Sequence, residues 1–371
     1  MSKVKVCCYL EHWANGGIEC FITNMLTTIP LDGLQVDIVA DLVEDSIYTQ
    51  TVKKVGVQVI EMSGKLRVAQ NEKVFKRLLE NNKYDIVHLH IFHGLALKYA
   101  KIAKECGVPV RIAHAHGAGL RKSPTKCLKL LLHYFGTARY KKYATHLLCC
   151  SYSAAEFMQF ENARIINNGI DVEKYAFNPE ARKEIRDTLS LDECHVIGHI
   201  GRLSNEKNHD FLLEVFSKIK KKCSDAVLLI VGEGDMHTQI ENRIAELGLA
   251  DSVKMLGARR DIPALLSAMD LFLFPSLVEG FGIVALEAQA SGLPIITSTA
   301  VPKDARISEN AYALQTTNSD EWTNLSLSLL VHKPYRETGV SAIKNAGFDR
   351  ETTANTMLDI YKNSYIDRGG N

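Results

Sequence analysis

Two carboxylates, Glu279 and Glu287, stand eight residues apart around a short Gly-rich loop in the run EGFGIVALE. Glu279 falls in the loop, and Glu287 falls one to two turns into the helix expected to begin there. A carboxylate accepts hydrogen bonds from two hydroxyl groups, which suits the diols of ribose or a hexose. The helix start adds free backbone N–H groups and a positive dipole end. This pattern predicts contacts to sugar hydroxyls and an anion, with two surface carboxylates as the alternative.

Two cations follow the apolar run HVIGHIG, within the segment GRLSNEKN. Arg202 and Lys207 fall at or near a helix start, where open parallel sheets bind ligands. Arg offers a forked pair of hydrogen bonds and Lys a point charge, so together they suit a diphosphate. The alternative is an ordinary surface Arg and Lys.

Further candidates follow two runs of the first half. Gly16 and Gly17 allow close backbone approach to a ligand before a helix start that suits phosphate, although a plain tight turn explains them equally well. His114 and His116 follow the run VPVRIA. We expect them to face opposite sides of a strand, so that at most one reaches a reacting centre. They also form a possible metal pair without an evident third ligand.

Two other site types have little support. The run Gly232-Glu233-Gly234 starts like a dinucleotide fingerprint, but His237 stands at the third glycine position and no acidic residue ends the next strand. The nine Cys include no C-x-x-C pair, so no zinc or dithiol site is expected. They fit a reducing compartment as small buried apolar side chains.

Short apolar runs alternate with helical patterns along the whole chain. Continuous Val/Ile/Leu runs between helices indicate parallel sheets covered on both faces, and two such sets predict two doubly wound α/β domains. The turn residues Asn167 to Asp171 mark the boundary. The expected divisions are 1–168, 169–348 and a C-terminal segment, 349–371. Within that segment a helix is expected over 349–364, with one apolar face formed by Ala354, Met357, Leu358 and Tyr361.

Composition narrows the class of protein. The 371 residues carry a formal net charge of +1, which argues against a surface uniformly built for nucleic acid. No apolar run approaches the roughly 20 residues that span a bilayer, and residues 1–10 lack a signal-peptide pattern. The net charge is a cancellation, because residues 1–170 sum to +8 and residues 171–371 to −7.

The basic excess is concentrated in residues 106–155, which contain eight Lys or Arg and no Asp or Glu. Within it, Lys122, Lys126, Lys129 and His133 have the spacing of one helical stripe. A basic amphipathic helix is typical of a membrane-surface or anion-binding element, with a solvated helix face as the alternative.

Taken together, these motifs resemble the retaining glycosyltransferases of family 4, over nearly the whole chain. The carrying segments are PSLVEGFGIVALEAQASGLP with its E-x7-E spacing, HIGRLSNEKNH, LLIVGEGD, MLGARRDIPALLSAMDLFLFPS, NNGIDVEKY and the N-terminal GGIE. Within the family, the chain is most similar to transferases of bacterial exopolysaccharide and capsule synthesis. The resemblance implies the GT-B fold, in which two Rossmann-like domains face each other across a cleft and the C-terminal helix crosses back to the first domain.

The resemblance also implies residue roles. Arg202 and Lys207 would stabilise the leaving diphosphate, Glu279 would bind the donor sugar, and Glu287 would bind the ribose. His116, or less favourably His114, would lie near the sugar. The remaining donor contacts would come mainly from the backbone, at Gly16, Gly17, Gly201, Gly257, Arg260, Phe281, Gly282, Ile283 and Val284.

In this interpretation a hexose passes from a UDP-sugar to a lipid-linked saccharide with retention of configuration and without a metal or other cofactor. The first domain would bind the acceptor and rest on an anionic membrane surface through Lys122, Lys126 and Lys129, at the inner face of the cytoplasmic membrane. No nucleic-acid partner is expected. A sugar-nucleotide epimerase and a non-catalytic sugar-nucleotide-binding protein are the alternatives. One departure is Asp304, where family relatives carry Glu.

Overall fold

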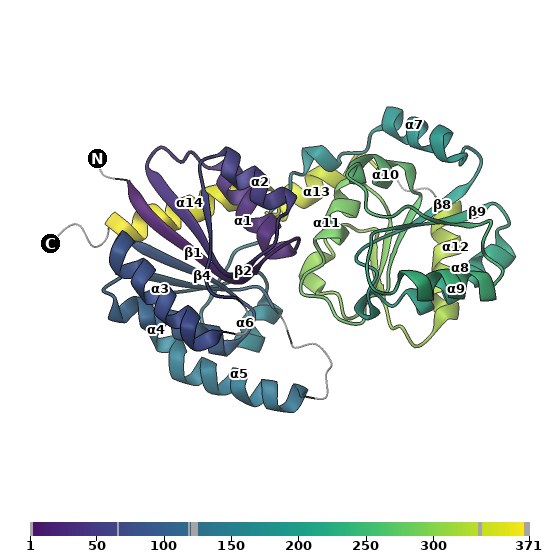
Figure 1. Ribbon diagram of the computed structural model, residues 1–371. Coiled ribbons are helices and arrows are strands. Elements are labelled where there is room, and N and C mark those ends of the chain that lie inside the picture. The colour runs from purple at the N-terminus through teal and green to yellow at the C-terminus, as the bar shows by residue number, and fades with distance from the viewer. Residues whose placement is uncertain (1–2, 65–66, 118, 120–124, 333–335, 367–371) are drawn as a thin grey trace. The chain divides into compact units, whose positions relative to one another are not determined.

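The computed structural model describes residues 3–64, 67–117, 119, 125–332 and 336–366. They form two compact α/β units (Figure 1). The chain passes from the first unit to the second between Gly169 and Ile170, and it returns to the first between Phe348 and Asp349. Each unit is built on one parallel sheet with helices on both faces, as the uninterrupted apolar runs predict.

The first unit contains a seven-stranded sheet in the order β3-β2-β1-β4-β5-β6-β7. Its strands are β1 (Val4–Trp13), β2 (Leu34–Val43), β3 (Gln58–Glu61), β4 (Ile86–Ile91), β5 (Val110–Ala115), β6 (His146–Cys149) and β7 (Arg164–Ile165). Its helices are α1 (Gly17–Thr28), α2 (Ile47–Lys54), α3 (Val68–Asn82), α4 (Lys98–Glu105), α5 (Lys126–Tyr140), α6 (Tyr152–Met158) and α14 (Arg350–Ile366).

Two cores cover the faces of this first sheet. Alternate residues of a strand point to opposite faces, so Cys7 packs with α3, α4 and α6, whereas Cys8 packs with α1 and α14. The expected apolar face of the last helix is confirmed, because Ala354, Met357, Leu358 and Tyr361 are all buried in the core shared with α1. Figure 1 shows α14, in yellow, beside α1. The C-terminal helix thus completes the first unit.

The second unit contains a six-stranded sheet in the order β10-β9-β8-β11-β12-β13. Its strands are β8 (His195–Ile200), β9 (Ala226–Val231), β10 (Val253–Met255), β11 (Leu271–Phe274), β12 (Ile295–Ser298) and β13 (Ala311–Leu314). Its helices are α7 (Pro179–Leu189), α8 (His209–Lys222), α9 (His237–Glu246), α10 (Ile262–Ala268), α11 (Ile283–Ala290), α12 (Ser319–Val331) and α13 (Gly339–Asn345).

In both sheets, the order in which successive strands are added changes side next to the first strand. The chain adds strands on one side of β1 and then crosses to β4, and it repeats this order around β8 and β11. Doubly wound sheets bind ligands outside the carboxyl ends of the two strands that flank this switch point. In the second unit those ends lead directly into the two segments that carry the predicted cations and carboxylates.

Candidate functional site

The centre of the candidate site is an ion pair between two loops of the second unit. Lys207 ends a short 3-10 turn, η4 (Asn205–Lys207), after β8, and its Nζ lies 2.6 Å from Glu279 Oε2 in the loop after β11. The same Nζ lies 4.6 Å from the centroid of the Phe274 ring. Each side chain of the pair is less than one-fifth exposed, so this pair has limited access to water without being sealed from a ligand.

The two loops are also joined through their backbones. Leu277 N donates to Glu206 O at 2.7 Å. A Cβ on Gly201 would lie 3.3 Å from Lys207 Cε, so the glycine leaves room for the lysine side chain. The arrangement holds Lys207 and Glu279 together at the carboxyl edge of the sheet.

Helix α11 begins directly after this loop. Gly282 has φ +84°, a left-handed conformation that favours glycine, and a Cβ there would lie 3.1 Å from Phe274 Cε1 and 3.2 Å from Glu279 Cγ. Phe281 is buried against Phe348, with ring centroids 5.4 Å apart, and can serve a ligand only through its backbone. Ile283 is half-buried, as is the next residue, Val284.

Glu287 lies on α11 and is half-buried. Burial raises the pKa of its carboxyl group, while a hydrogen bond from the Tyr175 side chain and the charge of Lys174 oppose that rise. Tyr175 ends the turn η3 (Glu173–Tyr175) in the segment NNGIDVEKY. Tyr175 was not predicted from the sequence as a partner of Glu287. The only signal for it was that the segment NNGIDVEKY resembles the family.

Arg202 is placed differently from Lys207. Its side chain is 69% exposed and its Nη2 lies 4.0 Å from Asp235 Oδ2. An exposed pair at that distance contributes little to stability. Arg202 therefore has freedom to reorient that Lys207 lacks.

The glycines of Gly232-Glu233-Gly234 have a packing role. A Cβ on Gly232 would lie 2.0 Å from Gly201 O, and one on Gly234 would lie 2.3 Å from Leu203 O. Leu203 N in turn donates to Glu233 O at 2.9 Å. The glycines let the loops after β8 and β9 pass backbone to backbone, which explains the run without a dinucleotide.

The segment proposed to meet the base follows β10. Gly257 has φ +65° and accepts a hydrogen bond from Gly232 N at 2.8 Å, so it is tied to the same loop system. Arg259 forms two hydrogen bonds with Asp261, whereas Arg260 is exposed.

In the first unit, the Gly16-Gly17 turn connects β1 with α1. Glu19 Oε1 accepts a hydrogen bond from Ala14 N at 2.8 Å, and the Glu19 side chain is buried. A Cβ on Gly16 would lie 2.7 Å from Glu19 Oε2. The buried carboxylate of Glu19 thus stabilises the turn through its hydrogen bond to the backbone. The motif GGIE did not indicate this role in the sequence.

The expectation that His114 and His116 face opposite ways is wrong. They are two positions apart on and just after β5, so they point to the same face, with ring centroids 4.2 Å apart. The expectation that no third ligand lies near is also wrong, because His90 of β4 joins them: His90 Nδ1 lies 3.0 Å from His116 Nε2.

The predicted basic stripe is only partly exposed. His133 is buried, with Nδ1 accepting from Gly94 N at 3.0 Å and Nε2 lying 2.9 Å from Phe157 O, so its place in a surface stripe is wrong. Lys126 is half-buried and Lys129 exposed. Lys122 lies outside the described residues.

The surface of α5 is instead rich in apolar side chains. The helix packs closely on the 3-10 turn η1 (Gly94–Leu97), since a Cβ on Gly136 would lie 2.6 Å from Gly94 C. Large side chains on its outer side remain exposed, namely Leu128, Leu131, Leu132, Tyr134 and Phe135. None of the described helices is both long and apolar enough to cross a membrane.

Two family models match this chain in series. The model described as "Glycosyltransferase Family 4" matches residues 15–174, and the model described as "Glycosyl transferases group 1" matches residues 181–346. The first match lies almost wholly in the first unit and the second lies within the second unit.

Curated relatives agree with these matches. The putative glycosyltransferase EpsF of Bacillus subtilis is 27% identical over 376 residues, which cover 97% of each chain. The UDP-Gal:alpha-D-GlcNAc-diphosphoundecaprenol alpha-1,3-galactosyltransferase of Escherichia coli is 33% identical over 235 residues, 60% of this chain and 59% of that relative.

A solved structure shares the fold of the whole chain. The Anabaena protein HepE in complex with UDP-glucose superposes with a TM-score of 0.78 at 21% identity, covering 97% of this chain and 99% of HepE. With two successive family models and two Rossmann-like units of the GT-B type, this chain belongs to glycosyltransferase family 4.

Proposed function

We propose that this glycosyltransferase moves a hexose-type sugar from a UDP-sugar to a lipid-linked saccharide with retention of configuration, in the synthesis of an exopolysaccharide, capsule or similar surface glycan. The observation that carries the proposal is the Lys207–Glu279 pair at the switch point of the second unit, directly before the start of α11. The cation and the free N–H groups there match the negative charge of a diphosphate, and the carboxylate can accept hydrogen bonds from sugar hydroxyls.

In this proposal the second unit binds the donor. Lys207 and Arg202 neutralise the diphosphate, and the exposed Arg202 swings onto it from its distant partner Asp235. Because Lys207 engages Oε2 of Glu279, Oε1 is left to accept hydrogen bonds from the donor sugar. Glu287, oriented by Tyr175, accepts from the ribose hydroxyls. The backbone around Gly257 and Arg260 meets the base.

We infer that the first unit binds the acceptor and completes the site with Gly16, Gly17 and His116. His116 is favoured over His114 because it is 7% exposed, whereas His114 is fully buried. In the transfer step the bond from the anomeric carbon to the phosphate oxygen breaks as the bond to the acceptor oxygen forms on the same face. The acceptor proton passes to the leaving phosphate oxygen, and the cations stabilise its developing charge. No metal is required in this scheme.

The test is transfer from radiolabelled UDP-sugars by single variants Glu279→Ala, Arg202→Ala and Lys207→Ala. We expect large losses of kcat for all three. Lys183→Ala is the matched control, since Lys183 is an exposed lysine of the same unit paired with Asp187. Full activity in all three site variants would refute the assignment.

The alternatives separate in simpler assays. Incubation with a sugar nucleotide and no acceptor yields an epimerised product only if the protein is an epimerase. A non-catalytic binding protein would be stabilised by the donor yet turn over no acceptor. Uridine is favoured by the names of two relatives, whereas mycobacterial relatives are named as GDP-mannose-dependent transferases. Thermal shifts with UDP- and GDP-sugars decide between the bases, and we expect UDP-sugars to raise Tm more.

We further propose that α5 rests on the anionic inner face of the cytoplasmic membrane. Leu131 is 67% exposed and stands near the exposed Lys129, so apolar insertion and attraction to anionic headgroups act from one helix. This placement brings the first unit to a lipid-linked acceptor. In this proposal the membrane contact is an apolar side of α5 flanked by lysines, and not the purely basic stripe expected from the sequence.

Vesicle cosedimentation tests the membrane proposal. Leu131→Ser with Phe135→Ser is expected to weaken binding to anionic vesicles, and neutralising Lys122, Lys126 and Lys129 to remove its salt dependence. Val331→Ser, at an equally exposed apolar residue of the second unit, is the control. Unchanged binding in both α5 variants would leave α5 as an ordinary solvated helix.

A further inference from the structure

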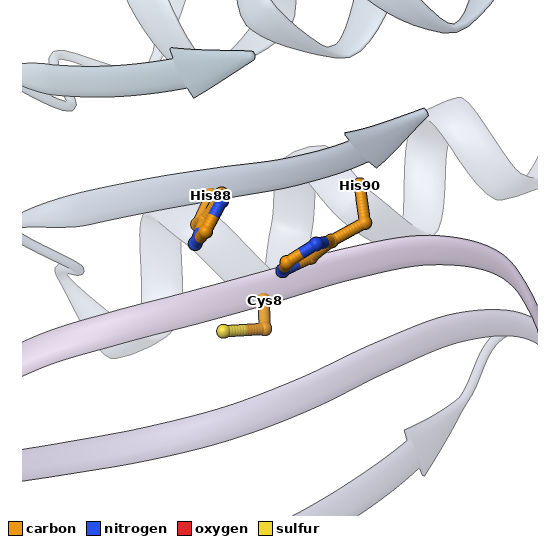
Figure 2. Close-up of side chains that lie close together, drawn as sticks. All are labelled: Cys8, His88 and His90. Carbon is orange, nitrogen blue, oxygen red and sulfur yellow. The ribbon is translucent and has the colours of Figure 1, made fainter. Parts of the chain in front are cut away.

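Five metal-ligating side chains gather on one face of the first sheet, in the core shared with α1 and α14. Figure 2 shows Cys8 of β1 close to His88 and His90 of β4. His114 is the register partner of His90 across β4 and β5, and His116 follows it. All five side chains are buried. We call this set the histidine cluster.

Hydrogen bonds connect most of the ring nitrogens. His88 Nδ1 lies 2.7 Å from the Tyr361 hydroxyl, His88 Nε2 lies 3.3 Å from His114 Nδ1, and His90 Nδ1 lies 3.0 Å from His116 Nε2. Among the described residues, however, His90 Nε2 and His114 Nε2 have no hydrogen-bond partner. Two unpartnered ring nitrogens in a core are unusual, since buried polar atoms are normally paired.

One set of tautomers satisfies all three hydrogen bonds and leaves both unpartnered nitrogens as lone pairs. In it, His114 Nδ1–H donates to His88 Nε2, and His90 Nδ1–H donates to His116 Nε2. His88 Nδ1–H then donates to the Tyr361 hydroxyl. A hydrogen bond from the other ring nitrogen that fixes the tautomer and orients the lone pair is the usual support of a metal-binding imidazole.

We propose that His90, His114 and His116 bind a divalent transition-metal ion of the zinc class, and that His116 Nε2 gives up its hydrogen bond from His90 to become the third ligand atom. Each ring places one nitrogen within 4.8 Å of those of the other two. Nitrogens around a tetrahedral zinc ion lie about 3.3 Å apart, given Zn–N bonds of about 2.0–2.1 Å, so small ring rotations close the site. The ion holds the carboxyl ends of β4 and β5 together. It is structural, and the sugar-transfer step does not pass through it; His116 binds it through Nε2 and keeps Nδ1–H for the contact to the donor sugar in the proposed function.

The neighbouring group of Cys8, His88 and His90 is less suitable. Both ring nitrogens of His88 already have hydrogen-bond partners, so this group has no free nitrogen at that position.

The test is zinc binding by the full chain after removal of metal with a chelator. A partly exposed group of His195, Cys223 and Asp225 in the second unit also offers metal ligands, so every measurement uses a Cys223→Ser background. We expect one retained Zn²⁺ per chain and a higher Tm with Zn²⁺. His90→Gln and His114→Gln should each weaken zinc binding by at least about tenfold. His133→Gln is the control, a buried histidine outside the cluster with both nitrogens paired.

A spectroscopic measurement covers the case in which a variant does not fold. The Cys223→Ser chain keeps the whole cluster, and its Co²⁺ complex is expected to show nitrogen ligation without a thiolate charge-transfer band. Zinc that is not retained, zinc binding unaffected by His114→Gln, or a thiolate band would each overturn the proposal. None of these measurements uses a sugar nucleotide, so their failure leaves the proposed transferase function intact.

Discussion

The two units place an aspartate at the same point of the same topology and surround it differently. Asp85 precedes β4, and its Oδ2 accepts from Lys5 N at 2.8 Å; Asp270 precedes β11, and its Oδ2 accepts from Val196 N at 2.8 Å. In return, the backbone N–H of Asp85 donates to Lys5 O, and that of Asp270 donates to Val196 O. Only Asp270 also receives two guanidinium groups, from Arg182 and Arg186, each at 2.6 Å.

The contrast continues at the opposite, carboxyl edge. The strands beside the switch point of the second unit lead to the Lys207–Glu279 pair, whereas those of the first unit lead to His93 and Glu11, 2.9 Å apart and about one-third exposed. Beneath that edge the first unit has neutral, buried histidines. The same strand order around the switch point therefore places a possible site at the same edge of each sheet. The side chains at the strand ends determine which chemistry that site can perform.

The largest expected difference concerns the two aspartates. Asp270→Ala leaves the buried Arg186 without its counter-charge, and we expect a loss of about 3–5 kcal/mol from the free energy of unfolding. Asp85→Ala removes a hydrogen bond to the backbone, worth about 1 kcal/mol. Urea unfolding with hydrogen exchange in β4 and β11 measures both. Equal losses would show that the arginines add nothing.

The ion pairs at the carboxyl edges should differ in their effect on catalysis. Glu279→Gln keeps the shape but removes the charge opposite Lys207, and we expect kcat/KM for sugar transfer to fall about 100-fold. Glu11→Gln in the first unit, an exposed pair worth about 1 kcal/mol or less, should change it by at most about fivefold. Similar effects of the two variants would contradict a donor site centred on the second unit's edge.

Acid should destabilise the first unit more than the second. In the first unit, burial lowers the pKa of His88 and His116 to about 3 and lowers that of His90 and His114 well below the usual range. In the second unit, burial lowers the pKa of His209 to about 4 and that of His199 well below the usual range. Unfolding releases each histidine to bind a proton below about pH 6.5, so stability present above that pH is lost as the pH falls.

The slope is about 1.4 kcal/mol per pH unit for each proton. The pKa of His133 of the first unit shifts in the same direction, so five such histidines against two make the loss steeper in the first unit. Asp41, whose pKa burial raises to about 6, opposes this trend, as Glu287 does in the second unit. Hydrogen exchange of β5 and β8 between pH 7 and pH 4.5 measures it. Equal slopes would contradict the neutral state of the cluster. Bound zinc would steepen the first unit's loss further.

The smallest difference concerns the glycines at the two helix starts. Gly282→Ala should destabilise the second unit by about 1–2 kcal/mol, because its φ is +84°, and should displace Glu279. Gly16 is extended and its added methyl group would meet only the end of the Glu19 side chain, so Gly16→Ala should change stability by about 0.5 kcal/mol or less. Thermal unfolding compares them, and a larger effect at Gly16 would reverse the expected order.

Features of the chain that depend on period and turn chemistry were predictable. The apolar runs correspond to parallel strands, and the turn Asn167–Asp171 contains the point where the first unit ends. The sequence could also suggest Lys207 and Glu279 as neighbours, because both follow strands at one edge of a sheet. Their separation of 2.6 Å depends on loop geometry that no local pattern encodes.

Other features depend on partners distant in sequence. The stripe of Lys126, Lys129 and His133 has the spacing of a polar face, yet the backbone contact at Gly136 makes His133 part of the packed side. Asp270 looks like an ordinary residue before a strand until Arg182 and Arg186 fold against it. The common face of His114 and His116 follows from the two-residue period of a strand, because residues two apart point to the same side. The expectation of opposite faces was an error of reasoning and not a lack of sequence information.

Helix α14 has a consequence for how the protein is made. It supplies Met357 and Tyr361 to the core around β1, but it follows the entire second unit in the chain. A ribosome therefore completes the second unit while one face of the first sheet, already covered in part by α1 and α2, still lacks α14. The usual order, in which the N-terminal domain matures first during synthesis, is reversed here. Until α14 emerges, the apolar side chains of β1 and α1 that pack against it stay uncovered.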